Sequence, residues 1–200
     1  MKIKNKILST ALIVFTLALG GCSVNFITAA KKPAPTNKPV FSAIKNPQKM
    51  THRTLSIDKP GDWQEVKQGM ILYYLPPGKT ATDTLAEKII VAVYSVPTSS
   101  KLTLAGFMKN DLADSQGSLS GLKFISADEA IKLGPLAARE EKYQAQIASS
   151  TISLTQIDAR AGDLLYKLQH YCVQNKCQAD GIFLEMAASF APIAATSTTK

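Results

Sequence analysis

The eight residues from Ile89 to Val96 constrain the fold of this chain most strongly. They are almost continuously apolar and rich in β-branched side chains, and no charged residue interrupts them. Because successive side chains of a strand point to opposite sides of its sheet, such a strand must be covered on both faces. The run therefore predicts a layered fold with a sheet in its middle.

Apolar residues at period two predict further strands of this sheet. These strands are expected at residues 54–58, 71–75, 143–147, 152–154 and 164–168. The last three, with a turn at Gly162, form an antiparallel meander. The apolar parity shifts between Leu154 and Ile157, which predicts either a bulge or the end of the buried face there.

Apolar residues at helical spacing predict two helices, over residues 104–112 and 182–190. Asp180 is the expected cap of the second helix and Pro192 its stop. The strands and helices together predict an α+β fold, in which a mostly antiparallel sheet carries helices on both faces.

The N-terminus has the layout of a bacterial lipoprotein signal peptide. Residues 1–21 begin with lysines, continue with an apolar run too short to span a bilayer, and end in Gly-Gly before Cys22. We predict cleavage before Cys22 and lipidation of its sulfur, against the alternative of an incidental cysteine near an ordinary cleavage site. The multiple acyl chains of a lipoprotein anchor a protein durably. Ser23 stands where the enteric inner-membrane retention signal has aspartate, so the resemblance implies a bacterial outer-membrane anchor facing the periplasm.

The rest of the chain predicts one domain on a tether. Residues 22–50 are rich in lysine and proline and show no hydrophobic period, which is typical of a flexible tether. The patterned residues 51–192 are enough for a single domain, and residues 193–200 form a polar tail.

The net charge indicates a mildly basic mature chain. Removing residues 1–21 takes away three lysines and no acid, so the net charge falls from +8 to +5. Nucleic acid is not an expected partner outside the cytoplasm. Anionic lipid or an acidic protein face would suit a modest cationic surface, although an ordinary solvated surface explains the charge equally well.

Cys172 and Cys177 are the two cysteines that remain after lipidation. In an oxidising compartment we expect them to form a disulfide. A redox pair is a rival reading, but their spacing is not C-x-x-C. A metal site is another, because His170 shares the face of Cys172 on a strand, yet a fourth ligand is missing in the sequence. We predict a structural bridge, no metal and no cofactor, and a strand histidine on a largely apolar face.

Other apparent motifs do not hold together as catalytic sites. Gly78-Lys79-Thr80 lacks the first glycine of a phosphate-binding loop. Glu140 and Glu141 are adjacent on a strand, so they point to opposite faces and are expected to be solvated. Trp63, Tyr73 and Tyr74 could form a recognition patch, but core packing is the favoured reading. We predict no catalytic residues and no enzyme.

The order of the elements resembles the PsbP-like superfamily, which includes PsbP, Ran-binding Mog proteins and the bacterial envelope lipoprotein DcrB. The residues that carry the resemblance are Ser56–Trp63, the later apolar strand and helix, Gly134-Pro135, Gly162 and the closing segment Phe183–Phe190. It covers about residues 51–192 and implies an αβα sandwich. The lipoprotein signal that ends at Cys22 makes DcrB the most similar member.

The resemblance also implies a non-enzymatic role. We expect a lipid-anchored accessory module that binds or assembles an envelope partner. The alternatives are a carrier of a small ligand or lipid, which needs an apolar cavity, and a hydrolase, which needs a cleft with converging titratable groups.

Overall fold

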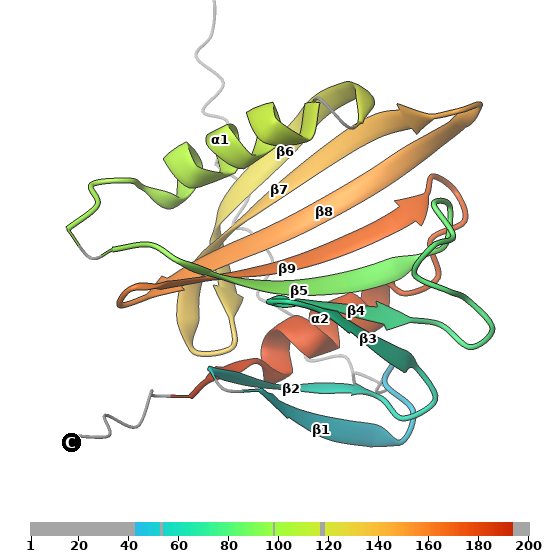
Figure 1. Ribbon diagram of the computed structural model, residues 1–200, viewed down its shortest axis with the longest axis horizontal. Helices are drawn as coiled ribbons and strands as arrows, with labels where there is room; N and C mark the ends of the chain where they lie inside the picture. Colours follow the sequence, from blue (N-terminus) through green and yellow to red (C-terminus); the bar gives the residue numbers. More distant parts are fainter. Residues whose placement is uncertain (1–42, 53, 98, 117–118, 194–200) are drawn as a thin grey trace, which may run out of the picture. The chain divides into compact units, whose positions relative to one another are not determined.

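The computed structural model describes residues 43–52, 54–97, 99–116 and 119–193, and these form ten strands and two helices (Figure 1). The first five strands are β1 (Pro47–His52), β2 (Leu55–Pro60), β3 (Gln64–Gln68), β4 (Ile71–Leu75) and β5 (Lys88–Ser95). After α1 (Leu104–Gln116) come β6 (Ser120–Leu133), β7 (Leu136–Ile147), β8 (Ser150–Ala161) and β9 (Leu164–Val173). The chain continues with α2 (Asp180–Ser189) and β10 (Ala191–Pro192).

The larger sheet has seven antiparallel strands in the order β3-β4-β5-β9-β8-β7-β6. β5, which contains the apolar run, pairs with β9 from Lys88 opposite Tyr171 to Ser95 opposite Leu164. This pairing joins the hairpin β3-β4 to the meander β6-β9. β5 therefore has a strand on each side. Ile89, Val91 and Val93 are buried on one face and Ala92 on the other, so both faces are covered as the run predicts.

Alternate residues of β9 separate the two faces of this sheet. His170 stacks on Phe183 of α2, with ring centroids 5.6 Å apart. Leu168 is two residues before His170 and therefore lies on the same face, where it belongs to the same core as α2. Lys167 points to the other face, where it pairs with Asp111 of α1. The two helices thus cover opposite faces of the sheet (Figure 1), and the predicted α+β layering is confirmed.

The main hydrophobic core lies between α2, the larger sheet and the small sheet β1-β2-β10. Its fully buried members come from all three, and they include Leu55, Ile57, Tyr74, Ile89, Leu133, Ile157 and Met186. A second cluster on the α1 side contains Tyr143, Ile152, Leu154 and Tyr171. The α2 side therefore holds the larger apolar core, and the α1 side is free to carry polar groups.

Gly134 allows the β6-β7 turn to contact the end of α2. Its φ of +55° lies in the left-handed region, and a Cβ there would come within 1.7 Å of the carbonyl oxygen of Phe190. Its N–H donates to the carbonyl of Ala187 at 2.7 Å. Glycine is required here both for the backbone conformation and for the close approach.

The structure corrects several sequence-based expectations. The folded part begins before Thr51, because Ile44 is 5% exposed and β1 starts at Pro47. The tether prediction therefore extended too far into the domain. At the other end the N–H of Ile193 donates to the carbonyl of Thr54, so the tail begins one residue later than predicted. The sequence pattern predicted no strand at β1, β3, β6 or the short β10.

β8 shows neither a bulge nor an end at the predicted parity shift. It pairs without interruption with β7 and β9 through Leu154 and Ile157. Both faces of the strand are covered, and on the α1 face the buried positions after Leu154 are the polar residues Gln156 and Asp158. The parity shift is thus the signature of buried polar side chains.

Candidate functional site

The predicted lipidation residue, Cys22, lies outside the described residues, as do the predicted signal peptide and most of the tether. Neither of the two helices that the structure describes is long and apolar enough to cross a membrane. Lipid attachment remains a prediction from the sequence.

The predicted disulfide is present at the end of β9. Cys172 and Cys177 are bonded, with Cα atoms 5.3 Å apart. Cys172 is only 2% exposed, whereas Cys177 is half-buried in the loop that leads to α2. The bridge therefore links β9 to the approach to α2, as expected.

His170 lies beside this disulfide and is faced by two carboxylates as well as by the apolar ring of Phe183. Its Nε2 is 2.8 Å from Oε1 of Glu87, and its Nδ1 is 3.2 Å from Oδ1 of Asp180. The expected apolar face is correct for the ring stacking, but the sequence did not predict either carboxylate.

Glu87 also receives the backbone at the start of α2. Its Oε1 accepts the N–H groups of Gln178 and Ala179 at 2.8 and 2.9 Å. Burial raises the pKa of Glu87, but the hydrogen bonds from His170, Ala179 and Gln178 outweigh this effect and hold the pKa below its ordinary value. The predicted cap, Asp180, is wrong: Ala179 is the N-cap residue, and its side chain makes no capping bond.

The α1 face of the sheet carries a buried polar network, which we call the α1-face network. Its members from the sheet stand in cross-strand rows on β7, β8 and β9: Arg139, Asp158 and Lys167 in one row, and Glu141, Gln156 and Gln169 in the next. Asp111 of α1 completes the network from above. The spacing of two residues along each strand places all these side chains on one face.

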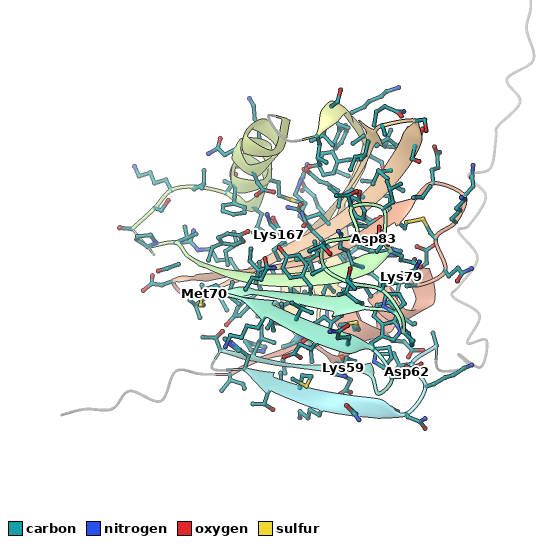
Figure 2. All side chains as sticks on the ribbon, turned by 45° about the vertical axis from the view of Figure 1, so that its right-hand side comes forward. Lys59, Asp62, Met70, Lys79, Asp83 and Lys167 are labelled. Atoms are coloured by element: carbon teal, nitrogen blue, oxygen red, sulfur yellow. A yellow bond between two sulfur atoms is a disulfide. The ribbon has the colours of Figure 1, made fainter. Side chains whose placement is uncertain are left out.

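Lys167 connects the sheet to α1. Its Nζ lies 2.6 Å from Oδ1 of Asp111, and it stands over the rings of Tyr94 and Phe107, 5.0 and 5.5 Å from their centroids. Figure 2 shows Lys167 directly beneath α1. The buried ammonium group is thus held by one carboxylate and two aromatic faces.

Asp158 is the most perturbed acid of the network. It is fully buried, and Gln156 donates to its Oδ2 at 2.9 Å. Oδ1 has no hydrogen-bond partner among the described residues. Burial raises the pKa of Asp158 to about 7, although Lys167 and the bond from Gln156 act in the opposite direction. Asp158 can therefore gain or lose a proton near neutral pH.

Glu141 is buried, and the expectation that it is solvated is wrong. It accepts a bond from Nε of Arg139 at 2.7 Å and a bond from the hydroxyl of Tyr143. Burial and the bond to Glu141 raise the pKa of Tyr143. Arg139 also pairs with Glu129. These charged groups are paired with one another on the sheet surface that α1 covers.

The opposite face offers an open groove beside α2. Two adjoining hollows of about 270 and 380 Å³ share Glu140 and Leu184. We call them together the α2 groove, and its lining includes Ile131, Glu140, Lys142, Thr155, Leu184 and Ala187. Leu184 is 59% exposed. The α2 groove combines an exposed leucine with charges of both signs at its sides.

The aromatic residues near the first turn belong to the core. Trp63 is 8% exposed and Tyr74 is fully buried, and both are members of the α2-side core. The recognition-patch alternative is therefore wrong for these two side chains.

No protein-family model matches the chain, and no curated protein matches its sequence. Solved structures do match its fold. The solution structure of cyanobacterial PsbP (CyanoP) from Synechocystis sp. PCC 6803 has a TM-score of 0.56 at 11% identity, covering 74% of this chain and 92% of that one. The Ran-binding protein Mog1p of Saccharomyces cerevisiae has a TM-score of 0.51 at 15% identity, covering 73% and 95%.

A weaker likeness is to LpqN of Mycobacterium tuberculosis, described as involved in cell envelope biogenesis. Its TM-score is 0.48 at 11% identity, with 69% and 82% of the two chains covered, which is too low to bear on fold or function. The likenesses to CyanoP and Mog1p, with the antiparallel sheet and two helices, show the α+β fold of the PsbP and Mog1 type. At these identities they show the fold alone.

Proposed function

We propose that this protein is a lipid-anchored accessory module of a bacterial cell envelope, attached through Cys22 and binding a protein partner without catalysis. The anchor rests on the charged start, the apolar run and the Gly-Gly-Cys22 ending of the first segment. Ser23 favours the outer membrane, facing the periplasm, and the lipoprotein signal that ends at Cys22 favours a DcrB-like role.

The observation that carries the binding role is the α2 groove with Leu184 at its centre. The side chain of Leu184 is 59% exposed. A partner that covers it would remove apolar surface from water, which would stabilise the complex. Leu184 stands where the two hollows meet, so one partner segment can contact both. The same fold serves as a Ran-binding protein in yeast Mog1p, which supports docking as a use of this architecture.

The lining of the α2 groove suggests the chemistry of the partner. Ile131, Leu184 and Ala187 provide an apolar floor, while Lys142 and Glu140 stand at the side and pair with each other at 3.1 Å. A segment with one apolar side and polar flanks fits this arrangement, as an amphipathic helix or strand of an envelope protein would.

The buried charged groups of the α1-face network do not contribute a catalytic site to the α2 groove. Lys167, Asp158 and Glu141 lie beneath α1 and are paired within the α1-face network. They do not converge on the α2 groove, which lies on the other face of the sheet. A catalytic site needs such groups to meet in an accessible cleft.

Site-specific photocrosslinking in intact cells tests the proposal. A photoreactive phenylalanine analogue is placed at position 184 and, as the matched control, at Met70, which is 54% exposed on the far turn between β3 and β4. We expect a discrete crosslinked partner band from position 184 only. In chains without the analogue, Leu184→Asp should abolish copurification of that partner from cells treated with a chemical crosslinker, and Met70→Asp should leave it unchanged.

Two outcomes would contradict the binding role. Recovery of only the monomer at native abundance, or equal crosslinking from positions 184 and 70, excludes the α2 groove as a specific docking site. Lipid alone copurifying with the chain would instead favour a carrier. The anchor is tested separately: incorporation of a labelled fatty acid should be lost in Cys22→Ser.

A further inference from the structure

The two cysteines of the disulfide, His170 and Glu87 lie close together and are all residues that can ligate a metal. Their proximity was not predicted from the sequence. One ligand atom each of Glu87, His170 and Cys172 lie within 4.8 Å of one another. Cys177 is bonded to Cys172 and therefore supplies a fourth donor at the same place. The sequence placed His170, Cys172 and Cys177 near one another but offered no fourth ligand. The pairing of β5 with β9 brings Glu87 to them, because Ile89 lies opposite His170.

The geometry points to a zinc site that exists only when the disulfide is reduced. Two thiolates, one imidazole nitrogen and one carboxylate oxygen are a suitable tetrahedral donor set for Zn²⁺. Tetrahedral zinc requires its two sulfur ligands to be about 3.8 Å apart and its nitrogen and oxygen ligands about 3.3 Å apart. The nitrogen and oxygen are now 2.8 Å apart. The change between nitrogen and oxygen is small, whereas the two sulfurs must move apart once their bond is broken. Cys177 can supply that movement, because it belongs to a loop with exposed neighbours, Asn175 and Lys176.

The groups around these donors already have the arrangement of an outer shell. A histidine that ligates zinc through one nitrogen usually donates its other N–H to a carboxylate, which fixes the ring. Nδ1 of His170 lies 3.2 Å from Oδ1 of Asp180, while Nε2 faces Glu87. The carboxylate of Glu87 is itself oriented by the N–H groups of Gln178 and Ala179. Zinc bound between His170 and Glu87 would keep these outer partners within reach, because the nitrogen and oxygen need to separate by only about 0.5 Å.

A small thiol can open the site through Cys177. Cys177 lines the α2 groove, whereas Cys172 is buried. A thiolate attacks the sulfur of Cys177, the S–S bond breaks, and its electron pair leaves on the sulfur of Cys172. A second thiolate then displaces Cys177 from the mixed disulfide, giving an oxidised small disulfide and two protein thiolates. Zinc binds both thiolates, and the proton held by His170 and Glu87 leaves to solvent.

The consequence is a switch between two alternative states of one site. The oxidised chain has a disulfide and no free sulfur ligand, so it lacks half of the donor set. The reduced chain can hold zinc, and bound zinc would protect both sulfurs from reoxidation. This inference is independent of the docking role of the α2 groove.

Metal titration of the full chain carrying Cys22→Ser, purified in detergent, tests the inference without interference from the third cysteine. One sample is oxidised and the other is treated with a water-soluble phosphine reductant. Zinc affinity is measured by competition with a chromophoric chelator, and Co²⁺ reports thiolate ligation through its charge-transfer absorption. We expect one Zn²⁺ per reduced chain, bound at least about 100-fold tighter than by the oxidised chain.

Variants separate ligands from neighbours. Cys172→Ser and Glu87→Gln should each weaken zinc binding and change the Co²⁺ spectrum. Asp180→Asn, which removes only the outer partner, should cost about 10- to 100-fold in affinity and keep the thiolate band. Asp83→Asn is the matched control, because its carboxylate lies in the loop before Glu87 but accepts the N–H of Leu85 instead; its affinity should equal that of the parent.

Equal zinc affinity in the oxidised and reduced chains, or the absence of thiolate absorption with Co²⁺, overturns the inference. Should reduction unfold the chain, zinc is expected to restore its circular dichroism and thermal transition. Failure of zinc to do so counts equally against the site.

Discussion

Asp158→Asn should change how the stability of the protein depends on pH. Asp158 is fully buried, and its pKa is raised from an ordinary 3.8 to about 7, chiefly by burial. Between these two values the folded chain keeps a proton that the unfolded chain has lost. The free energy of unfolding of the parent therefore falls as the pH rises through this window, at a slope of up to about 1.4 kcal/mol per pH unit.

The magnitude follows from the two pKa values. Their difference of about three corresponds to a loss of about 4 kcal/mol between pH 4 and pH 8. Asparagine has nearly the same shape but no titrating proton. The free energy of unfolding of Asp158→Asn minus that of the parent should therefore rise by about 4 kcal/mol across this range, and by less where the interior relaxes around the charge.

Urea denaturation provides the assay, because Trp63 is the single tryptophan of the chain and is buried in the core. Its fluorescence reports unfolding at each pH. The matched control is Asp128→Asn, whose carboxylate is exposed on β6. A parent-to-variant difference that stays within about 0.5 kcal/mol from pH 4 to pH 8, or that falls, would refute the account of a strongly desolvated acid.

Two further predictions concern the backbone. Gly134→Ala should destabilise the protein by about 3 kcal/mol or more, because its Cβ would collide with the Phe190 carbonyl. Gly162 has a similar φ but open space around it, so Gly162→Ala should destabilise by only about 1 kcal/mol. Equal losses of stability in urea denaturation would contradict the steric argument. Arg160→Lys should speed hydrogen exchange in the segment after β5, since the guanidinium donates to the carbonyls of Val96 and Pro97, and unchanged exchange there would exclude this bracing role.

The parts of the fold that the sequence predicts are those with a strong local pattern. The apolar run of β5 required a covered strand, and the helical spacing of Leu104, Phe107, Met108 and Leu112 predicted α1. The disulfide was predictable because Cys172 and Cys177 are near in sequence and no closer thiol competes within the domain. Each of these inferences needed only residues within one element or one loop.

The elements that the sequence did not predict are those whose burial depends on residues far away in the chain. β6 is an edge strand with mostly exposed residues and three register shifts along its pairing with β7, so no alternation of apolar residues marks it. β3 is polar in the same way. The α1-face network could have been suspected from Gln156, Asp158, Lys167 and Gln169, which alternate with apolar residues inside otherwise apolar strands. Its burial depends on α1, more than 40 residues earlier in the chain, which no local period reveals.

The two faces of the sheet respond to different chemistry, and this separation is itself testable. Asp158 and Lys167 act on the face beneath α1, whereas Cys172 and His170 act on the face toward α2. Opening the disulfide should cost about 2 kcal/mol by the chain-entropy model for so short a loop. Because Asp158 and the disulfide lie on opposite faces of the sheet, the effects of Asp158→Asn and of Cys172→Ser with Cys177→Ser on the free energy of unfolding should add to within about 0.5 kcal/mol at every pH. A larger coupling energy would mean that protonation beneath α1 is transmitted through the sheet to the disulfide, and the two layers would then have to be treated as one switch.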